Sequence, residues 1–347
     1  MPYPERQLIA TIRRAAKLRS SALVTGIGDD CAVLRIPRGH ELLVTTDFSL
    51  EGVHFRREWH PAASVGHRCL TRGLSDIAAM GGQPLAAFLS LALPSDLDQS
   101  WADEFLKGLL ALARRHKVPL AGGDIAQSLA GVLADITVLG SVPKGRAVLR
   151  STARAGDLIY VTGSLGASAA IIEALYAGLQ LHRPDAPPSS PQADHSDAPP
   201  LSRSDRVGTL DAHFYPQPQI AIGRYLRENR LATAMIDISD GLSTDLSHIC
   251  EESHVGAIIQ ETAIPLAKLN SPRVHLRHAL HGGDDYQLLF TARPKTKVPR
   301  RIAGVTITQI GEITRRRQLL IRSADGSSRE LKSEGWQHFQ PDQSIRQ

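Results

Sequence analysis

The chain has few cysteines, few aromatic residues and no long apolar run. Its 347 residues include three cysteines, which lie far apart and form no CxxC pair. The sequence therefore predicts neither a disulfide framework nor a cysteine-based zinc site, and it is typical of a cytoplasmic protein with reduced thiols. No segment approaches the ~20 apolar residues that a membrane-spanning helix needs. The first twenty residues lack the apolar run of a signal peptide and predict an amphipathic helix instead.

Aromatic side chains make up only 5% of the sequence, too few for a surface on which nucleic-acid bases stack. The net charge is +5, but the basic residues are scattered or lie in presumed loops such as 315–317. This pattern favours a solvated basic surface over a nucleic-acid interface. A weak positive field would also attract anionic phosphate substrates.

The length of the chain predicts two domains, because a single core is rarely this large. Strand-like and helix-like segments alternate on both sides of Arg150. We therefore expect two α/β (or α+β) domains, an N-terminal one over 1–148 and a C-terminal one over 149–347. Residues 183–207 are rich in Pro, Ser and Asp and nearly free of large apolar side chains, which predicts a disordered insertion at the surface.

Hydrophobic periodicity locates the main elements of both domains. Strands are predicted at 41–45, 85–93, 132–142, 158–161, 234–238, 256–259, 286–291 and 305–310. Helices are predicted at 64–80, from Ser100 to about 116, from the end of the 158–161 strand to 176, and at 244–253. Ser100 is the expected N-cap of the second helix, with Asp103 reaching back to the free amides.

Short segments rich in glycine and aspartate stand out against this background. Each alone is equally well explained as a turn, because Gly-Asp is common in turns. The segments are GIGDD at 26–30, TTD at 45–47, SD at 75–76, GGD at 122–124, DISDG at 237–241 and GGDD at 282–285. We expect them at strand ends, where α/β proteins usually bind ligands.

A cluster of carboxylates needs either protons or cations. Two carboxylates ~4 Å apart repel each other by about 4 kcal/mol at an effective dielectric constant of ~20. Oxygen ligands without His or Cys partners select hard ions, and Mg²⁺ is favoured where phosphates bind. The sequence therefore predicts a magnesium and phosphate site.

Other nucleotide-binding motifs are missing. The chain has no GxxxxGK[ST] phosphate loop. The segment that starts at Gly26 begins like GxGxxG, but it lacks the third glycine and places two acids where a pyrophosphate would lie. No Ser-His or Cys-His pattern indicates a covalent nucleophile.

Seven ordered motifs resemble those of the thiamine-monophosphate kinase family over nearly the whole chain outside 183–207. They are GIGDDCAVL, TTDFSLEGVHF, LSDIAAMGGQP, GGD, GRAVLRSTARAGDLIYVTG, IDISDGLSTDL and GGDDYQLLF. The resemblance implies the two-domain aminoimidazole-ribotide synthetase-like fold, in which the N-terminal sheet forms the interface of a homodimer. It also implies ATP-dependent, direct in-line phosphorylation of thiamine monophosphate to thiamine diphosphate, the last step in making that cofactor.

The resemblance also implies a role for individual residues. Several Mg²⁺ ions would be held by Asp30, Thr45, Thr46, Asp47, Asp76, Asp124, Asp237 and Asp240. ATP would be contacted by Gly123, Asp124, Arg150 and Ser239, and thiamine monophosphate by His54, Asp284 and Trp336. Of these, Asp47, Asp124 and Arg150 would act in catalysis. The chain departs from the family at Asp284, where GGDDYQL replaces GGEDYEL.

Two alternatives remain open from the sequence. One is an enzyme of the aminoimidazole-ribotide synthetase type, and the other is a non-catalytic ATP or Mg²⁺ sensor on the same fold. The selenophosphate synthetase branch is disfavoured, because residues 1–25 contain no cysteine. The chemistry agrees with a kinase: a phosphate acceptor is mostly dianionic at neutral pH and needs no general base, only relief of its repulsion from ATP.

Overall fold

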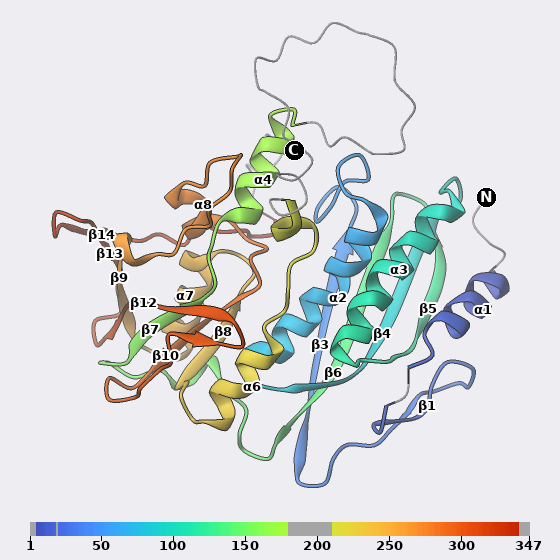
Figure 1. The fold of residues 1–347 in the computed structure, drawn as a ribbon, viewed down its shortest axis with the longest axis horizontal. Coiled ribbons are helices and arrows are strands. Elements are labelled where there is room, and N and C mark those ends of the chain that lie inside the picture. Colours follow the sequence, from blue (N-terminus) through green and yellow to red (C-terminus); the bar gives the residue numbers. More distant parts are fainter. Residues whose placement is uncertain (1–4, 19, 180–209, 340–347) are drawn as a thin grey trace, which may run out of the picture.

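The structure is a computed structural model that describes residues 5–18, 20–179 and 210–339. The insertion predicted at 183–207 lies outside these residues. Figure 1 shows the N-terminal half in blue to green beside the C-terminal half in green to red, each built around its own sheet. The α/β architecture predicted from the sequence is therefore confirmed.

The N-terminal half is a four-stranded sheet with the strand order β3-β6-β4-β5. Two long helices, α2 and α3, pack on one of its faces. A short hairpin of β1 and β2 follows the N-terminal helix α1 (Figure 1). The elements are α1 (Glu5–Ala15), β1 (Leu23–Thr25), β2 (Val33–Leu34), β3 (His40–Leu50), α2 (Ala62–Ala79), β4 (Gln83–Pro94), α3 (Gln99–His116), β5 (Leu120–Ser128) and β6 (Leu133–Pro143).

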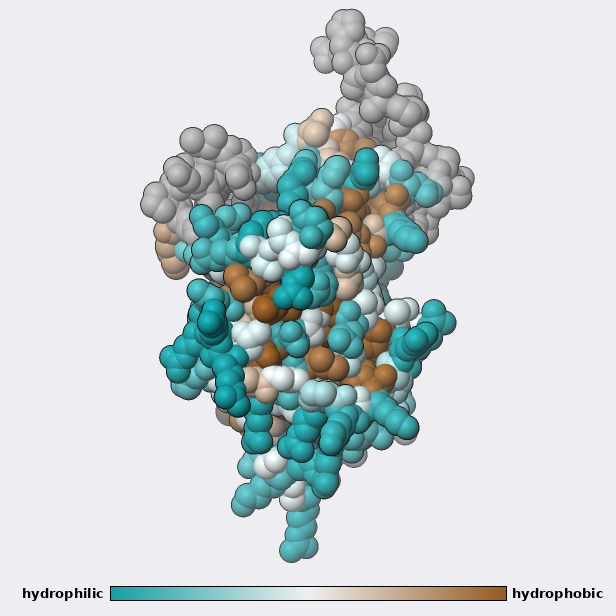
Figure 2. Space-filling view, turned by 90° about the vertical axis from the view of Figure 1, so that its left-hand side faces the viewer, coloured by the Kyte–Doolittle hydropathy of each residue, from teal (hydrophilic) through white to brown (hydrophobic). Residues whose placement is uncertain are grey.

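The C-terminal half is an eight-stranded sheet with the order β14-β13-β9-β12-β7-β10-β8, in which β11 also pairs with β12. Its elements are η1 (Arg150–Thr152), β7 (Leu158–Thr162), α4 (Ala167–Tyr176), α6 (Ile220–Glu228), β8 (Ala234–Ile238), α7 (Leu242–Glu252), β9 (Gly256–Gln260), η2 (Glu261–Ala263), α8 (Leu276–His281), β10 (Gln287–Ala292), β11 (Arg301–Ile302), β12 (Val305–Thr314), β13 (Leu319–Arg322) and β14 (Ser328–Glu330). Figure 2 shows this end of the molecule, where hydrophilic side chains surround apolar ones gathered near the middle.

Helices α2 and α3 approach each other closely enough to require glycine. A Cβ atom at Gly66 of α2 would lie 1.9 Å from the Phe105 carbonyl oxygen, and one at Gly108 of α3 would lie 1.8 Å from the Ala63 oxygen. Buried leucines of β4, such as Leu91, pack beneath them. The glycines fix the position of α2 over the sheet.

Helix α2 is shared by both halves of the molecule. One of its sides packs on β3 and β6, and the other packs on α6 and β8 (Figure 1). At Gly223 of α6 a Cβ atom would lie 2.0 Å from the Ala78 oxygen, so α6 also needs glycine at its contact with α2. Buried side chains of both halves, including Leu74 and Phe290, form one apolar cluster. Among the described residues, no helix is long and apolar enough to cross a membrane.

Three expectations from the sequence are corrected by the structure. Asp98, not Ser100, caps α3, because its carboxylate accepts the Ser100 N–H at 3.0 Å. The strand predicted at 41–45 extends to Leu50, since its outward and inward side chains keep alternating. Of the acidic segments expected at strand ends, 45–47 lies inside β3, 122–124 inside the unpredicted strand β5, and 75–76 inside α2.

A buried polar chain crosses the junction between the halves. His60 and His213 are joined through their Nε2 atoms at 2.9 Å, and Arg68 donates to the His213 carbonyl oxygen at 2.6 Å. Burial, then the charge of Arg68, lowers the pKa of His60 to about 3, and burial lowers that of His213 well below its usual value. Both imidazoles are therefore neutral in the folded protein.

This pair predicts a loss of stability in mild acid. Between about pH 6.5 and 3 the unfolded chain binds a proton at His60 that the folded protein does not, so the free energy of unfolding falls as pH falls, by about 1.4 kcal/mol per pH unit for each such histidine. Replacing His60 by Gln should reduce the dependence of the free energy of unfolding on pH by the contribution of one histidine. The measurement is the denaturant midpoint from pH 7 to pH 5 for both proteins, and equal slopes would contradict the assignment.

Candidate active site

The carboxylates that the sequence singled out meet where β3, α2 and β8 come together. Thr45 and Asp47 point from β3 to the side of the sheet that α2 covers, and the Thr45 hydroxyl donates to the Asp76 carboxylate. Next to Asp76 on α2, the Ser75 hydroxyl donates to Asp237 Oδ2 at 2.7 Å. The structure thus brings together side chains from three elements that are far apart in the chain.

Burial and neighbouring negative charge raise the pKa values in this group. Burial and then Asp76 raise the pKa of Asp47 to about 7, and the same two causes raise that of Asp237 to about 7. Burial likewise raises the pKa of Asp76, whereas the charges of Arg150 and the Thr45 hydrogen bond favour its ionised form. The group is short of positive charge, and a bound cation would relieve the repulsion.

The donor set fits Mg²⁺ held between protein and phosphate. All the donors are carboxylate or hydroxyl oxygens, which hard cations prefer. Within 5–18, 20–179 and 210–339, no three Asp, Glu, His or Cys side chains converge on a point that would hold a metal. Because Mg²⁺ usually binds one or two carboxylates and completes its shell with phosphates and water, the separated carboxylates suit ions that bind together with a nucleotide.

The sheet separates other predicted ligands from this group. The Thr46 side chain points to the open face of the sheet, where its hydroxyl donates to Asp135 at 2.7 Å. Asp124 is in register with Ser90 of β4, which is itself in register with Asp135, so Asp124 lies on the open face too.

Two further predicted ligands, Asp30 and Gly123, lie in a loop and in strand β5. Asp30 is exposed in the loop between β1 and β2. Gly123 has φ 149°, and a Cβ atom there would lie 1.8 Å from the Leu89 carbonyl oxygen. This position of β5 requires glycine because β5 passes β4 too closely for a side chain.

The loop after β8 is organised by a residue that the sequence did not single out. Asp245, in the first turn of α7, accepts the N–H groups of Ser239, Asp240 and Gly241 through one oxygen, each at 3.1 Å. The Asp284 N–H in turn donates to the Ser239 oxygen at 2.8 Å. The predicted ATP contact Ser239 and the metal candidate Asp240 are therefore held beside the 282–285 turn.

His54 faces the same region with a defined tautomer. Burial, then the charge of Arg72, lowers the pKa of His54 to about 3, so the ring is neutral. Its Nδ1 accepts the Leu50 N–H at 3.0 Å, which leaves the ring proton on Nε2. His54 can therefore donate a hydrogen bond from Nε2 to a ligand oxygen.

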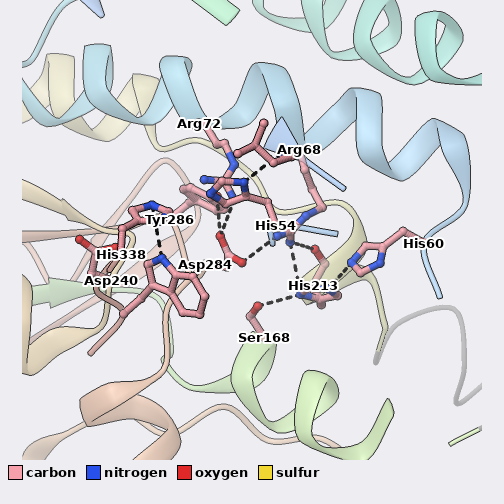
Figure 3. Close-up of polar contacts among 12 residues, drawn as sticks. His54, His60, Arg68, Arg72, Ser168, His213, Asp240, Asp284, Tyr286 and His338 are labelled. Atoms are coloured by element: carbon pink, nitrogen blue, oxygen red, sulfur yellow. Dashed lines mark hydrogen bonds and ion pairs between the residues drawn. The ribbon is translucent and has the colours of Figure 1, made fainter. Parts of the chain in front are cut away.

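Asp284 is held by two arginines of α2. Arg68 contacts Asp284 Oδ2 at 2.7 Å, Arg72 contacts Oδ1 at 3.4 Å, and the Tyr286 hydroxyl donates to Oδ1 at 2.6 Å (Figure 3). Burial alone would raise the pKa of Asp284, but the two guanidinium groups hold it well below its usual range. Its backbone φ of 64° is left-handed, so the turn itself aims this side chain.

The C-terminal segment lies over this part of the site. The Trp336 backbone N–H donates to the Asp240 oxygen at 3.1 Å, and its indole N–H donates to His338 Nε2 at 3.5 Å. The centroids of the His338 and His54 rings are 5.7 Å apart. The structure thus brings His54, Asp284 and Trp336, the three predicted substrate contacts, into one region with His338.

Sequence reasoning missed Arg68, Arg72, Asp245 and His338. For the arginines a signal was present, because Arg68, Arg72 and Asp76 are spaced by four residues and so share one face of a helix. A surface hollow of about 330 Å³ lies elsewhere, lined by Arg224, Tyr225 and Arg301 among others, and no predicted site residue borders it.

Removal of the Asp245 carboxylate should loosen the loop after β8. Asp245→Ala leaves three backbone N–H groups without their acceptor, so we expect a loss of about 1–3 kcal/mol in the free energy of unfolding. Glu251→Ala, at an exposed position of the same helix, is the matched control. Denaturant unfolding of both variants checks this, and equal stabilities would contradict the role of Asp245.

Residues 28–142 match the family of AIR synthase related proteins in its N-terminal domain, and residues 154–321 match its C-terminal domain. The thiamine-monophosphate kinase of Escherichia coli K12 is 38% identical over 333 residues, which cover 93% of this chain and 95% of that protein. The one from Bacillus subtilis is 31% identical with the same coverage.

Solved structures give the same result. The thiamine-monophosphate kinase of Stenotrophomonas maltophilia superposes with a TM-score of 0.77 at 32% identity, covering 96% of this chain and 99% of that one. AaThiL in complex with AMPPCP and TMP has a TM-score of 0.73 at 29% identity, covering 96% and 97%. A hydrogenase maturation protein HypE in complex with ATP shares the fold at 18% identity, with a TM-score of 0.72 and 94% of each chain covered.

Proposed function

The chain belongs to the thiamine-monophosphate kinase family, and we propose that it transfers the terminal phosphoryl group of ATP to thiamine monophosphate in one in-line step. The observation that carries the proposal is the meeting of two groups of residues at α2. The carboxylates Asp47 and Asp237 lie around Asp76, and the substrate candidates His54 and Asp284 lie around Arg68 and Arg72, one and two turns earlier on the same face of α2. A relative with both an ATP analogue and TMP bound supports both substrates.

Several Mg²⁺ ions would be held by the oxygens of the carboxylate group and its neighbours. The candidate ligands are Asp30, Thr45, Thr46, Asp47, Asp76, Asp124, Asp237 and Asp240. When bound, Mg²⁺ would supply charge neutralisation between the phosphates of donor and acceptor. The raised pKa values of Asp47 and Asp237 support this proposal, because these side chains gain most from a nearby cation.

The remaining residues bind and orient the two substrates. We assign ATP to Gly123, Asp124, Arg150 and Ser239, with Asp47, Asp124 and Arg150 acting at the transferred group. Arg150 is suited to this role because its guanidinium is exposed and close enough to favour the ionised forms of Asp76 and Asp237.

On the acceptor side, His54 donates from Nε2 to an oxygen of thiamine monophosphate, and Asp284 borders the same subsite. The Trp336 indole is partly exposed and offers its ring face to the thiazolium cation. No residue needs to remove a proton, because the acceptor phosphate is already mostly ionised at neutral pH. Binding and orientation are the work of the protein.

The proposal predicts one product pair and a strict dependence on Mg²⁺. ATP and thiamine monophosphate should yield ADP and thiamine diphosphate in equal amounts, and EDTA should abolish turnover. Asp47→Asn and Asp124→Asn should each lower kcat at least ~10²-fold, while Asp96→Asn, at an exposed position, serves as the control.

The two products are measured by chromatography, and turnover of each variant is measured as the Mg²⁺ concentration is varied. If both variants keep near-wild-type turnover at limiting Mg²⁺, the metal assignment is wrong. If aminoimidazole-ribotide synthetase substrates turn over instead, the protein acts on the alternative branch. Binding of ATP without any turnover would identify a sensor.

We also propose that two copies pair through the N-terminal sheet and that the dimer works in the cytoplasm, where ATP and reduced thiols are found. Strand β3 is an edge strand, and its outward side chains include Leu42, Val44 and Phe48. Val44 is 61% exposed and Phe48 54% exposed. An edge strand with an apolar outer row supports an interface between copies.

Placing a charge in this row should separate the copies. Val44→Glu should convert a dimer to a monomer, because burying an unpaired carboxylate in an apolar contact is costly. Leu129→Glu is the control, since Leu129 is 98% exposed and lies in the loop between β5 and β6. Sedimentation velocity gives the mass of each, and a Val44→Glu dimer would contradict this interface.

A further inference from the structure

Arg72 is a partly buried arginine of α2 at the junction of the two halves. It projects from α2 one turn before Asp76, and its side chain is only 15% exposed. Among the described residues its guanidinium makes one hydrogen bond, the 3.4 Å contact with Asp284. Arginine carries several N–H donors in a planar fork, so most of those of Arg72 remain available to a ligand.

Arg68, one turn earlier on α2, is different. It is 3% exposed and donates to the His213 carbonyl oxygen at 2.6 Å and to Asp284 at 2.7 Å. These contacts join the two halves, so Arg68 is a structural residue. Figure 3 shows both arginines reaching the same Asp284 carboxylate.

Arg68 and Arg72 are the positive charges beside Asp284. Both guanidinium groups face the Asp284 carboxylate, and the Arg72 charge also favours the ionised forms of Asp47 and Asp76. Tyr286 stays a neutral phenol because burial raises its pKa well above the usual value, and His54 is a neutral imidazole that donates from Nε2. The free N–H donors of Arg72 beside a neutral donor suit a ligand anion with several oxygens.

The position of Arg72 indicates which anion. Arg72 lies next to His54 at a narrow gap that has no room for a water molecule and is also bordered by Ser49, Phe55, Val65 and Arg68. Arg72 thus lies with the acceptor-side residues His54 and Asp284, whereas Arg150 lies by Asp76 and Asp237. The Arg72 charge also reaches Asp47.

We propose that Arg72 binds the phosphate group of the organic monophosphate acceptor, and that Asp284 holds the Arg72 side chain in place for this contact. The inference rests on the proposed function and adds a substrate-binding residue to it. It also gives a reason for an aspartate at 284: the shorter carboxylate is engaged by arginines of α2 rather than left free for the substrate.

The test compares two ligands that differ only in the phosphate. Calorimetric titration in Mg²⁺ buffer gives the Kd of thiamine monophosphate and of thiamine for the full chain. Arg72→Gln should weaken binding of the monophosphate ~10- to 100-fold, the scale of a lost charged hydrogen bond, and change the Kd of thiamine less than about two-fold. Arg72→Lys should recover part of the loss, and in turnover the KM for the monophosphate should rise while that for ATP stays.

Arg115→Gln, at an exposed position of α3, is the control for loss of one positive charge. The melting temperature of each variant shows that the fold persists. Equal binding of the monophosphate by Arg72→Gln and wild type, or an equal loss for both ligands, would overturn the role of Arg72 alone. A wild-type protein that binds neither ligand would instead overturn the proposed function.

Discussion

The mutual repulsion of buried carboxylates around α2 is the constraint on which the rest of this molecule depends. Asp47, Asp76 and Asp237 come from different elements, and the charge of Asp76 raises the cost of ionising the other two. A fold selected only for stability would not bury them together. In the proposed function, cations and phosphates that bind here would relieve this repulsion, so substrate binding would offset an electrostatic cost of the fold.

Helix α2 makes this arrangement possible because both halves of the molecule pack against it. Glycines at 66, 108 and 223 allow α3 and α6 to approach α2 within backbone contact distance. From this fixed helix, Asp76 faces the carboxylates while Arg68 and Arg72 face Asp284. In the proposed function, the donor and acceptor ends of the phosphoryl transfer would therefore lie along one helix, which is the positioning that such a reaction requires.

Much of the fold could be predicted from the sequence, whereas the arrangement of the site depends on contacts between distant segments. The α/β architecture, strand β8 and helix α4 follow from local periodicity, and the acidic motifs identify the family. The sequence could not show that the sheet divides the ligand candidates, with Asp47 on the covered face and Asp124 on the open one, because that follows from the register of β3 and β5. Nor could it show the partners of Asp284, which lie more than two hundred residues away.

The central claim can be tested directly through stability without divalent cations. At a pH above about 7, the folded protein carries an ionised Asp47 whose pKa burial and Asp76 have raised, so this carboxylate destabilises the fold. The decisive measurement is the melting temperature of wild type and Asp47→Asn at pH 8, in EDTA and in Mg²⁺ with an ATP analogue. The account predicts that Asp47→Asn melts higher than wild type in EDTA and gains less from the ligands. An Asp47→Asn protein that melts lower in EDTA and gains as much as wild type would contradict it.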